Sequence, residues 1–521
     1  MQEVRTSRVI IVGAGLGALY AALELAPRPV LMISPETLGE GASSAWAQGG
    51  VAAAMDGADS PSAHAADTVR AGAGTVDADV AAQVTRAARD HILDLTGLGT
   101  PFDRTPEGDY VLSREAAHSF SRVVRVRGDQ AGAEIMKALI ARVRAAASVQ
   151  VLEGVTATAL DVSDGCVTGV AVESARVPSG SVMLRGPAVL LAGGGSGGLY
   201  ALTTNPPRIR GQVIGMAARA GAMVADAEFV QFHPTAIDVG EDPAPLATEA
   251  LRGEGAVLIN RLGERFMTAV HPDAELAPRD VVARAIFAQA QAGLRPMLDT
   301  RDAIGARIVT QFPAVAEACA RNGIDPVTRP IPVAAAAHYH MGGIDTDAEG
   351  RASLGNLWVC GEASSTGLHG ANRLASNGLL EALVYARLCA RGIAATLADT
   401  PDQAPALRVD FPPGPAWPDE AAILTLRRMM TDRVGVIRDA SGLKSALAEI
   451  ARLEADQCGA EGFVNMTATA TLIAAAALVR EESRGAHYRA DFPQTDDIAA
   501  RTRMTLDRAL AIRAQAVKEA Q

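Results

Sequence analysis

Cysteine is scarce in this chain of 521 residues, which contains five cysteines and no Cys-X-X-Cys pair. They are scattered along the sequence at Cys166, Cys319, Cys360, Cys389 and Cys458. Zinc sites usually draw on closely spaced cysteine pairs, and disulfide frameworks need an even, clustered set, so neither is expected here. Scattered free cysteines are typical of a reducing compartment, and we predict a cytoplasmic protein.

Excess positive charge is also absent, since 48 lysines and arginines face 59 aspartates and glutamates and the net charge is −11. A pI near 5.4 argues against nucleic acid or an anionic membrane as the main partner. Residues 1–7 are polar and lack the apolar core of a signal peptide. The longest apolar helical run, residues 467–479, is too short to span a bilayer. We therefore expect no nucleic-acid or membrane partner.

The length of the chain exceeds what one hydrophobic core supports, so two or three domains are expected. Residues 8–12 and 29–33 are apolar, β-branched runs typical of buried parallel strands, and residues 16–26 between them have a helical pattern. Buried-strand character returns at residues 189–192 and 357–360. These elements predict an α/β fold with a Rossmann-like nucleotide-binding domain.

Three further regions complete the predicted architecture. Residues 151–172 alternate and turn at Asp164-Gly165 like a small antiparallel insert. Residues 226–337 have few long apolar runs and many loops, which predicts an inserted α+β capping domain. After the proline-rich residues 412–418, apolar side chains recur every three or four residues, which predicts a C-terminal helical bundle.

These patterns divide the chain into three predicted domains. They are a Rossmann-like domain at residues 1–225 and 338–410, the capping domain at residues 226–337, and a helical domain at residues 420–521. Individual helices are predicted at residues 377–395, 443–454, 467–482 and 498–516.

A glycine-rich turn joins the first predicted strand to the first predicted helix. Gly13, Gly15 and Gly17 allow a tight turn and let a pyrophosphate approach the helix N-terminus, and the small residue Ala18 ends the fingerprint. Ser34 stands where an acid usually binds the ribose of NAD. The turn alone therefore leaves both NAD and FAD open.

Three distant segments favour FAD. Residues 43–50 read Ser-Ser-Ala-Trp-Ala-Gln-Gly-Gly, residues 192–195 read Ala-Gly-Gly-Gly, and residues 358–363 read Trp-Val-Cys-Gly-Glu-Ala. With residues 366–381, the most specific part, they resemble the flavoprotein family of succinate dehydrogenase, fumarate reductase and L-aspartate oxidase over residues 6–395. The resemblance implies that FAD is bound by Gly13, Gly15, Gly17, Ala18, Ser34, Ser43, Ser44, Gln48, Gly49, Gly50, Ala192, Gly193, Gly194, Glu362, Ser376, Asn377 and Leu379.

The resemblance also assigns roles inside this cofactor site. Glu362 would hold hydroxyl groups of the ribitol or the ribose. Ser376, Asn377 and Leu379 would lie beside the isoalloxazine at a helix N-terminus, where the helix dipole stabilises negative charge on reduced flavin.

Two positions depart from the usual pattern of the family. Ser43 stands where the dehydrogenases carry the histidine that bonds covalently to FAD, so the FAD is expected to be non-covalent. Residues 211–213 read Gly-Gln-Val where the family usually has Gly-Asp-Gly. The effect of Gln212, Val213 and Ser34 on FAD affinity stays open.

Five polar segments, at residues 229–235, 248–255, 278–280, 338–343 and 369–373, look like the dicarboxylate site of the family and occur in the family's order. Arginine grips a carboxylate with a planar fork of donors, and histidine or threonine adds neutral donors. The resemblance assigns substrate binding to Thr248, Arg373, His233 and His338, and catalysis to Arg279 together with the two histidines.

Residues 113–119 read Ser-Arg-Glu-Ala-Ala-His-Ser and resemble a segment of the L-aspartate oxidase branch, in which the glutamate precedes two glycines. Ala116 and Ala117 replace those glycines. A buried Glu115 carboxylate would be an unpaired charge against the methylenes of succinate, whereas the ammonium of aspartate would neutralise it. Glu115 is therefore predicted to bind the substrate and to select an amino dicarboxylate during catalysis.

The resemblance implies FAD-dependent oxidation of L-aspartate to iminoaspartate, with hydride transfer from Cα to flavin N5. O2 or fumarate would reoxidise the flavin, and quinolinate synthase would take the imine in NAD biosynthesis. A fumarate reductase or succinate dehydrogenase subunit is the first alternative, and a flavin-containing binding or RNA-modifying protein is the second. Arg279 as a base, Arg279 as a purely electrostatic group, the preferred acceptor and the oligomeric state stay open.

Overall fold

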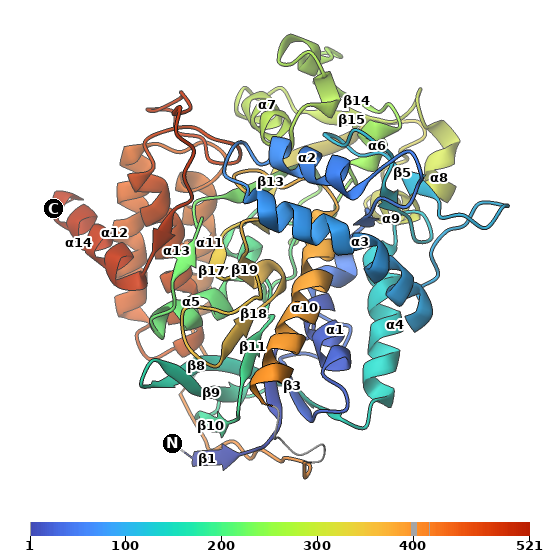
Figure 1. Ribbon diagram of the computed structural model, residues 1–521. Coiled ribbons are helices and arrows are strands. Elements are labelled where there is room, and N and C mark those ends of the chain that lie inside the picture. The colour runs from blue at the N-terminus through green and yellow to red at the C-terminus, as the bar shows by residue number, and fades with distance from the viewer. Residues whose placement is uncertain (1, 398–403, 416, 521) are drawn as a thin grey trace.

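A five-stranded parallel sheet lies at the centre of the molecule in the computed structural model, which describes residues 2–397, 404–415 and 417–520 (Figure 1). The strand order is β18-β11-β2-β3-β7, and all four pairings are parallel. The strands are β2 (Val9–Val12), β3 (Val30–Ser34), β7 (Val149–Glu153), β11 (Val189–Leu191) and β18 (Leu357–Val359). Residues 398–403 and 521, which fall in the predicted Rossmann-like and helical segments, lie outside the described residues.

Helices cover this sheet, and two of them, α1 (Leu16–Glu24) and α10 (Asn377–Thr396), pack against each other although they are far apart in the sequence (Figure 1). The predicted end of the first helix at residue 26 is wrong by two residues. Ala26 precedes Pro27, and the proline ring disfavours helical backbone in the residue before it. On the same side of the sheet lie α2 (Pro61–Ala71), α3 (Ala78–Leu98) and α4 (Ala131–Ala145), whereas α5 (Gln212–Arg219) packs in the hydrophobic cluster on the opposite face.

A second sheet has the order β1-β10-β9-β8 and contains the predicted hairpin. Its strands are β1 (Gln2–Arg5), β8 (Val155–Ser163), β9 (Cys166–Ser174) and β10 (Val182–Arg185). The prediction of an antiparallel insert over residues 151–172 is wrong at its start, because residues 151–153 belong to β7 of the parallel sheet. The alternation of apolar and polar residues continues across Gly154, whose φ of +76° turns the chain from one sheet to the other. The sequence pattern alone therefore did not reveal that the two strands belong to different sheets.

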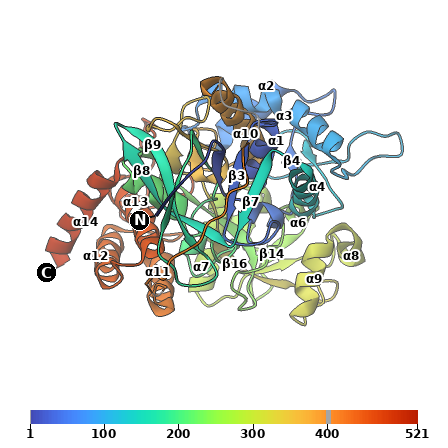
Figure 2. The same ribbon diagram turned by 90° about the horizontal axis from the view of Figure 1, so that it is seen from below.

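The inserted region forms an antiparallel sheet with the order β13-β16-β15-β14, covered by helices (Figure 2). Its strands are β13 (Val230–Ile237), β14 (Val257–Ile259), β15 (Met297–Asp299) and β16 (Ile331–His340), and its helices are α6 (Ala250–Gly253), α7 (Arg279–Gln291), α8 (Ile308–Gln311) and α9 (Pro313–Arg321). Strand β16 runs across the boundary predicted between residues 337 and 338 and carries His338 back towards the parallel sheet.

The C-terminal region is a bundle of α11 (Glu420–Arg433), α12 (Ala440–Asp456), α13 (Glu461–Val479) and α14 (Leu506–Ala520). The predicted helices were wrong at residues 480–482 and 498–505. Arg480 ends α13 by ion-pairing with Glu228, and residues 503–504 form strand β20 (Arg503–Met504), which pairs with β12 (Val224–Ala225). Helix α13 is long and apolar enough to cross a membrane, but 78% of its apolar window is buried, so it is the core helix of the bundle. The predicted α/β fold with an α+β insert and a helical bundle is confirmed.

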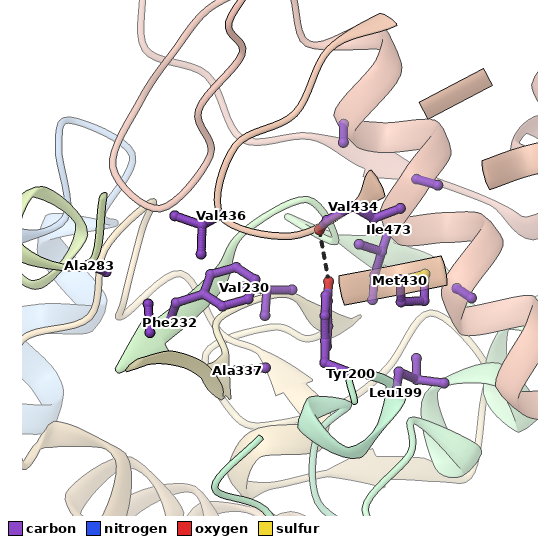
Figure 3. Close-up of a cluster of buried hydrophobic side chains, with 14 of the residues drawn as sticks. Leu199, Tyr200, Val230, Phe232, Ala283, Ala337, Met430, Val434, Val436 and Ile473 are labelled. Carbon is purple, nitrogen blue, oxygen red and sulfur yellow. Dashed lines mark hydrogen bonds between the residues drawn. The ribbon is translucent and has the colours of Figure 1, made fainter. Parts of the chain in front are cut away.

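One hydrophobic core joins the inserted sheet to the C-terminal bundle (Figure 3). Phe232 of β13 meets the ring of Tyr200 edge-on with 5.5 Å between ring centroids, and the Tyr200 hydroxyl donates a hydrogen bond to the Val434 carbonyl. Met430 of α11 and Ile473 of α13 complete the contact. Each such side chain stabilises the fold by about 1.5–3 kcal/mol relative to exposure, so the bundle and the insert stabilise each other.

Arg438 connects the two parts of this core through hydrogen bonds to backbone carbonyls. Its guanidinium is 1% exposed and donates hydrogen bonds to the carbonyls of Val434, Gly435 and Glu228. Glu228 lies two residues before β13, so one side chain satisfies carbonyls of both the bundle and the segment that leads into the inserted sheet.

We expect Arg438→Ala to lower the free energy of unfolding by on the order of 3 kcal/mol, because it leaves buried carbonyls without donors. The measurement is the melting temperature of the holoprotein by calorimetry. Arg452→Ala is the control, because Arg452 lies on the surface of α12 with 58% of its side chain exposed and should change stability little. Equal melting temperatures for the two variants would contradict the proposal that the hydrogen bonds of Arg438 stabilise the fold.

Candidate active site

A cavity of about 770 Å³ lies where the parallel strands end. The residues that follow β2, β3, β11 and β18 line it, as expected for a ligand site at the carboxyl edge of a parallel sheet. Residues 241–246 and helix α9 of the inserted region line it from the other side. The predicted cofactor residues on its wall are Gly13, Gly15, Gly17, Ser34, Ser43, Ser44, Gln48, Ala192, Gly193, Gly194, Glu362 and Leu379.

The turn between β2 and α1 accepts only glycine at Gly13. Its φ is +126°, and a Cβ there would lie 2.2 Å from the Ala192 carbonyl oxygen. Gly15 precedes the first turn of α1 without a side-chain cap, and the backbone N–H of Leu16 donates to Ser44 Oγ at 3.1 Å. The backbone thus approaches the cavity closely at a helix N-terminus, which suits a pyrophosphate.

Glu362 follows β18, which lies two strands from β2, and lines the cavity at the same carboxyl edge of the sheet. Its Oε1 accepts a hydrogen bond from the backbone N–H of His340 at 2.9 Å. Burial raises the pKa of Glu362 to about 7. The carboxyl group is therefore oriented by the backbone and is suited to bind hydroxyl groups.

Other polar groups on the wall also fit an FAD. The buried Oε1 of Gln48 has no hydrogen-bond partner among the described residues, so it can accept from a bound molecule. Ser34 donates its hydroxyl to the Glu36 carbonyl, and Ser43 donates to Asn205 Oδ1. With the glycine turn and Glu362, these groups make a cradle suited to a dinucleotide.

The start of α10 is arranged differently from the expectation. The Asn377 side chain lies outside the cavity wall and binds His64 Nε2 at 2.8 Å and Thr68 Oγ1 at 3.0 Å. Ser376 directs its hydroxyl to Glu115 Oε2 at 2.9 Å. Ala18, Gly49 and Gly50 are also not among the residues that line the cavity, so a contact of these five residues with FAD stays a prediction.

Arg373 lines the cavity and is the most informative side chain of the predicted substrate site. It is 6% exposed, its Nε is buried without a partner, and no carboxylate pairs with it among the described residues. Its guanidinium lies 4.3 Å from the centre of the Tyr339 ring. Burial, together with the charge of Arg279, lowers the pKa of Arg373 to about 10. A buried guanidinium without a counter-ion is suited to bind an anionic ligand.

Arg279 occupies the first position of α7 and is fixed by neighbours. It pairs with the Glu249 carboxylate and donates to Gln231 Oε1 at 3.1 Å. Glu249 also lies 3.2 Å from Arg252 Nη2. Burial favours the neutral form of Glu249, but Arg279 and Arg252 outweigh it and hold the pKa of this carboxyl below its ordinary value. Arg279 is therefore an oriented, paired cation, unlike Arg373.

His233 and His338 lie together, with ring centroids 5.0 Å apart. Burial, with the positive charges around them, lowers the pKa of both rings well below the ordinary value, so both are neutral near pH 7. The Nδ1 of His233 accepts from the Thr235 backbone N–H at 3.2 Å, which leaves the proton on Nε2. The Thr248 hydroxyl accepts a long hydrogen bond from the Ala250 N–H. These residues offer neutral donors.

Glu115 is not among the residues that line the cavity; it is buried beside Gly49 and Ser376, with 4% of its surface exposed. Burial and the charge of Glu249 raise the pKa of Glu115, while Arg279 and Arg373 are close enough to act in the opposite direction. An acid whose pKa is raised in this way binds a cationic group favourably, because the cation relieves the unpaired charge.

Four residues of this region were missed by sequence reasoning. Glu249 and Gln231 hold Arg279, Tyr339 lies under Arg373, and Thr204 contacts His338 Nδ1 at 2.8 Å. Glu249 and Gln231 lie within segments already singled out, but a lone glutamate or glutamine gives no sign of its partner. No motif in the sequence points to Thr204.

Comparison with known proteins identifies the family. Residues 8–379 match the FAD binding domain family, and residues 459–518 match the family described as fumarate reductase flavoprotein C-term. An L-aspartate oxidase from Caulobacter vibrioides is 53% identical over 96% of both chains, and one from Xylella fastidiosa is 47% identical over 97% of this chain and 96% of its own. The chain belongs to the L-aspartate oxidase family.

Membership in the L-aspartate oxidase family makes the chain an FAD-dependent oxidoreductase and confirms the predicted FAD cofactor. The fold is shared more widely. A quinol–fumarate reductase structure solved with menaquinol superposes with a TM-score of 0.85 and 27% identity, covering 96% of this chain and 95% of that chain.

We expect Gly13→Ala to prevent FAD binding, because the added methyl collides with the Ala192 carbonyl at a φ that alanine rarely adopts. The ratio of flavin to protein absorbance after purification measures the outcome. Gly57→Ala is the control, because Gly57 lies in a loop with nothing within 4 Å of the added Cβ. A yellow, fully loaded Gly13→Ala protein would refute the proposed turn.

We expect Arg373→Met to raise the KM or Kd for a dicarboxylate by about 100-fold, since a charge-assisted bidentate contact is lost and binding falls by on the order of 3 kcal/mol. Perturbation of the flavin spectrum on titration with succinate measures binding without turnover. Arg284→Met on the outer part of α7 is the control. Unchanged succinate affinity in Arg373→Met would remove Arg373 from the site.

Proposed function

We propose that this protein oxidises L-aspartate to iminoaspartate, with FAD as the hydride acceptor, as the first step towards quinolinate and NAD. The observation that carries the proposal is a pair of buried opposite charges. Arg373 has no carboxylate partner among the described residues, and the buried Glu115 carboxylate accepts a side-chain hydrogen bond only from Ser376 there. A ligand that satisfies both must carry a carboxylate and a cationic group, as aspartate does. The names of the L-aspartate oxidase relatives support the same reaction.

Different residues of the site bind the two carboxylates and the ammonium of the substrate. Arg373 holds one carboxylate with its planar donors, and Thr248 with the two neutral histidines holds the other. Glu115 binds the ammonium, which fixes the orientation of Cα between the two ends. Bound FAD would supply the acceptor, at its N5 atom, for the hydride that leaves Cα, and the proton that the ammonium loses as the imine forms would pass to the adjacent Glu115 carboxylate or to solvent.

Arg279 acts electrostatically in this proposal. Its guanidinium is paired with Glu249 and hydrogen-bonded to Gln231, so it is oriented and its charge is partly neutralised. A guanidinium group keeps its proton at neutral pH, which makes it a poor base for the amine. It stabilises negative charge on the substrate while the neutral His233 and His338 donate hydrogen bonds.

The electron acceptor and the cellular setting belong to the same proposal. O2, giving H2O2, or fumarate would reoxidise the flavin, and quinolinate synthase would use the unstable imine. Non-covalent FAD fits Ser43, which binds Asn205 and offers no imidazole. Five free cysteines fit a reducing cytoplasm.

A fumarate reductase or succinate dehydrogenase flavoprotein is the second candidate, because the chain shares their fold and the C-terminal family. Glu115 argues against it, since succinate has no cation to meet a buried acid. Hydrogen peroxide release when L-aspartate is added to the purified yellow protein is the deciding assay. Flavin bleaching by succinate but not by aspartate would favour the second candidate.

We expect Glu115→Gln to reduce kcat/KM for L-aspartate by about 100-fold while fumarate reduction by the reduced enzyme changes less than about threefold, because only aspartate presents an ammonium. Anaerobic stopped-flow measurements of flavin absorbance follow both half-reactions. Glu107→Gln, an exposed acid in the preceding loop, is the matched control. Equal losses in both half-reactions would exclude Glu115 from selecting the amine.

A further inference from the structure

The loop that carries Glu115 has no regular secondary structure of its own. It connects β5 (Leu112–Ser113) to β6 (Val123–Val124). Ala117 within it has a φ of +64°, in the left-handed region that favours glycine. An alanine stays in that region only when surrounding contacts hold the backbone. The loop therefore needs external anchors.

Two buried carboxylates hold the backbone on either side of Ala117. The N–H of Ala116 donates to Glu249 Oε1 at 3.0 Å. The N–H of Ser119 donates to Asp67 Oδ2 at 2.7 Å, and the Ser119 hydroxyl donates to Asp67 Oδ1 at 2.7 Å. Asp67 thus binds the loop with both oxygens, four residues after Glu115.

Arg122 fixes the position and charge of Asp67. Its buried guanidinium donates to Asp67 Oδ2 at 2.6 Å and pairs with Asp59 through two bonds of 2.8 and 3.0 Å. Asp59 makes no contact with the loop backbone between residues 113 and 121 in the described structure. The side chains of Asp67 and Asp59 are therefore equally buried partners of Arg122, the last residue of the loop, and only Asp67 also binds Ser119 near Glu115.

Helix α2, which carries Asp67, also contacts the turn that contains Ser376, the residue that donates a hydrogen bond to Glu115. His64 and Thr68 of α2 bind Asn377, the residue after Ser376. Ser376 donates its hydroxyl to Glu115. Helix α2 therefore contacts both the loop that bears the acid and the turn that orients its carboxylate.

We propose that Asp67 is a positioning residue for amine selection: by holding Ser119 it keeps the Glu115 carboxylate where the substrate ammonium binds. The inference rests on the proposed function, since it assigns Glu115 to that ammonium. Asp67 makes no hydrogen bond to Glu115 or to Arg373 among the described residues, and it reaches Glu115 through the bonds to Ser119. Its role is separate from FAD binding and from the arginines that hold the carboxylates.

The test is Asp67→Asn, which keeps the shape of the side chain and removes its charge and one acceptor. We expect KM for L-aspartate to rise about tenfold or more, because small displacements of a positioned group have effects of this size. Fumarate reduction, flavin content and kcat should stay within about twofold of wild type. Ser119→Ala, which deletes one of the two bonds, should shift KM in the same direction by a smaller factor, and it carries the test if Asp67→Asn does not fold.

Asp59→Asn is the matched control, because it removes an equally buried carboxylate from the Arg122 side chain at the end of the loop and leaves both hydrogen bonds to Ser119 in place. Equal effects of Asp59→Asn and Asp67→Asn on KM for aspartate would overturn the inference, as would equal loss of aspartate oxidation and fumarate reduction in Asp67→Asn. If Glu115→Gln behaves as expected and Asp67→Asn matches wild type, the role of Asp67 alone fails. If Glu115→Gln leaves the substrate preference unchanged, the proposed function fails and the role of Asp67 fails with it.

Discussion

The electrostatic constraint at the centre of this protein is a set of buried charges that the fold does not fully neutralise. Arg373 is held over the Tyr339 ring with no carboxylate partner among the described residues. Glu115 is buried beside the charge of Glu249, and its pKa is raised. Burying such groups costs free energy unless a ligand pairs with them. The site is therefore complementary to an amino dicarboxylate.

Arg279, the second arginine of the site, is paired with a carboxylate, unlike Arg373. Arg279 is paired with Glu249, which also lies beside Arg252, and is oriented by Gln231, so its charge is partly neutralised before a ligand binds. The same Glu249 accepts a hydrogen bond from the loop that carries Glu115. One buried carboxylate thus links helix α7 of the inserted region to the selecting loop, and a change at either affects both.

Shared packing and hydrogen bonds hold the three parts of the molecule together. The inserted sheet and the helical bundle share a core around Phe232 and Tyr200, and Arg438 satisfies carbonyls of both. Strand β16 begins in the inserted sheet and ends with His338 and His340 at the parallel sheet. The cofactor wall and the substrate residues are therefore supported by elements from across the chain.

The sequence by itself determined the parallel strands, the glycine turn and the helical C-terminus, because buried strands, close backbone approach and helix periodicity leave local patterns. Through its resemblance to a known family it also pointed to Arg373, Glu115 and the two histidines as residues suited to an amino dicarboxylate. It could not reveal that residues 151–153 join the parallel sheet, or that Asn377 turns away to His64, since both depend on distant partners. Only the tertiary structure decided that Arg279 is paired and Arg373 is not, because a charge is buried or neutralised only by what the fold brings beside it.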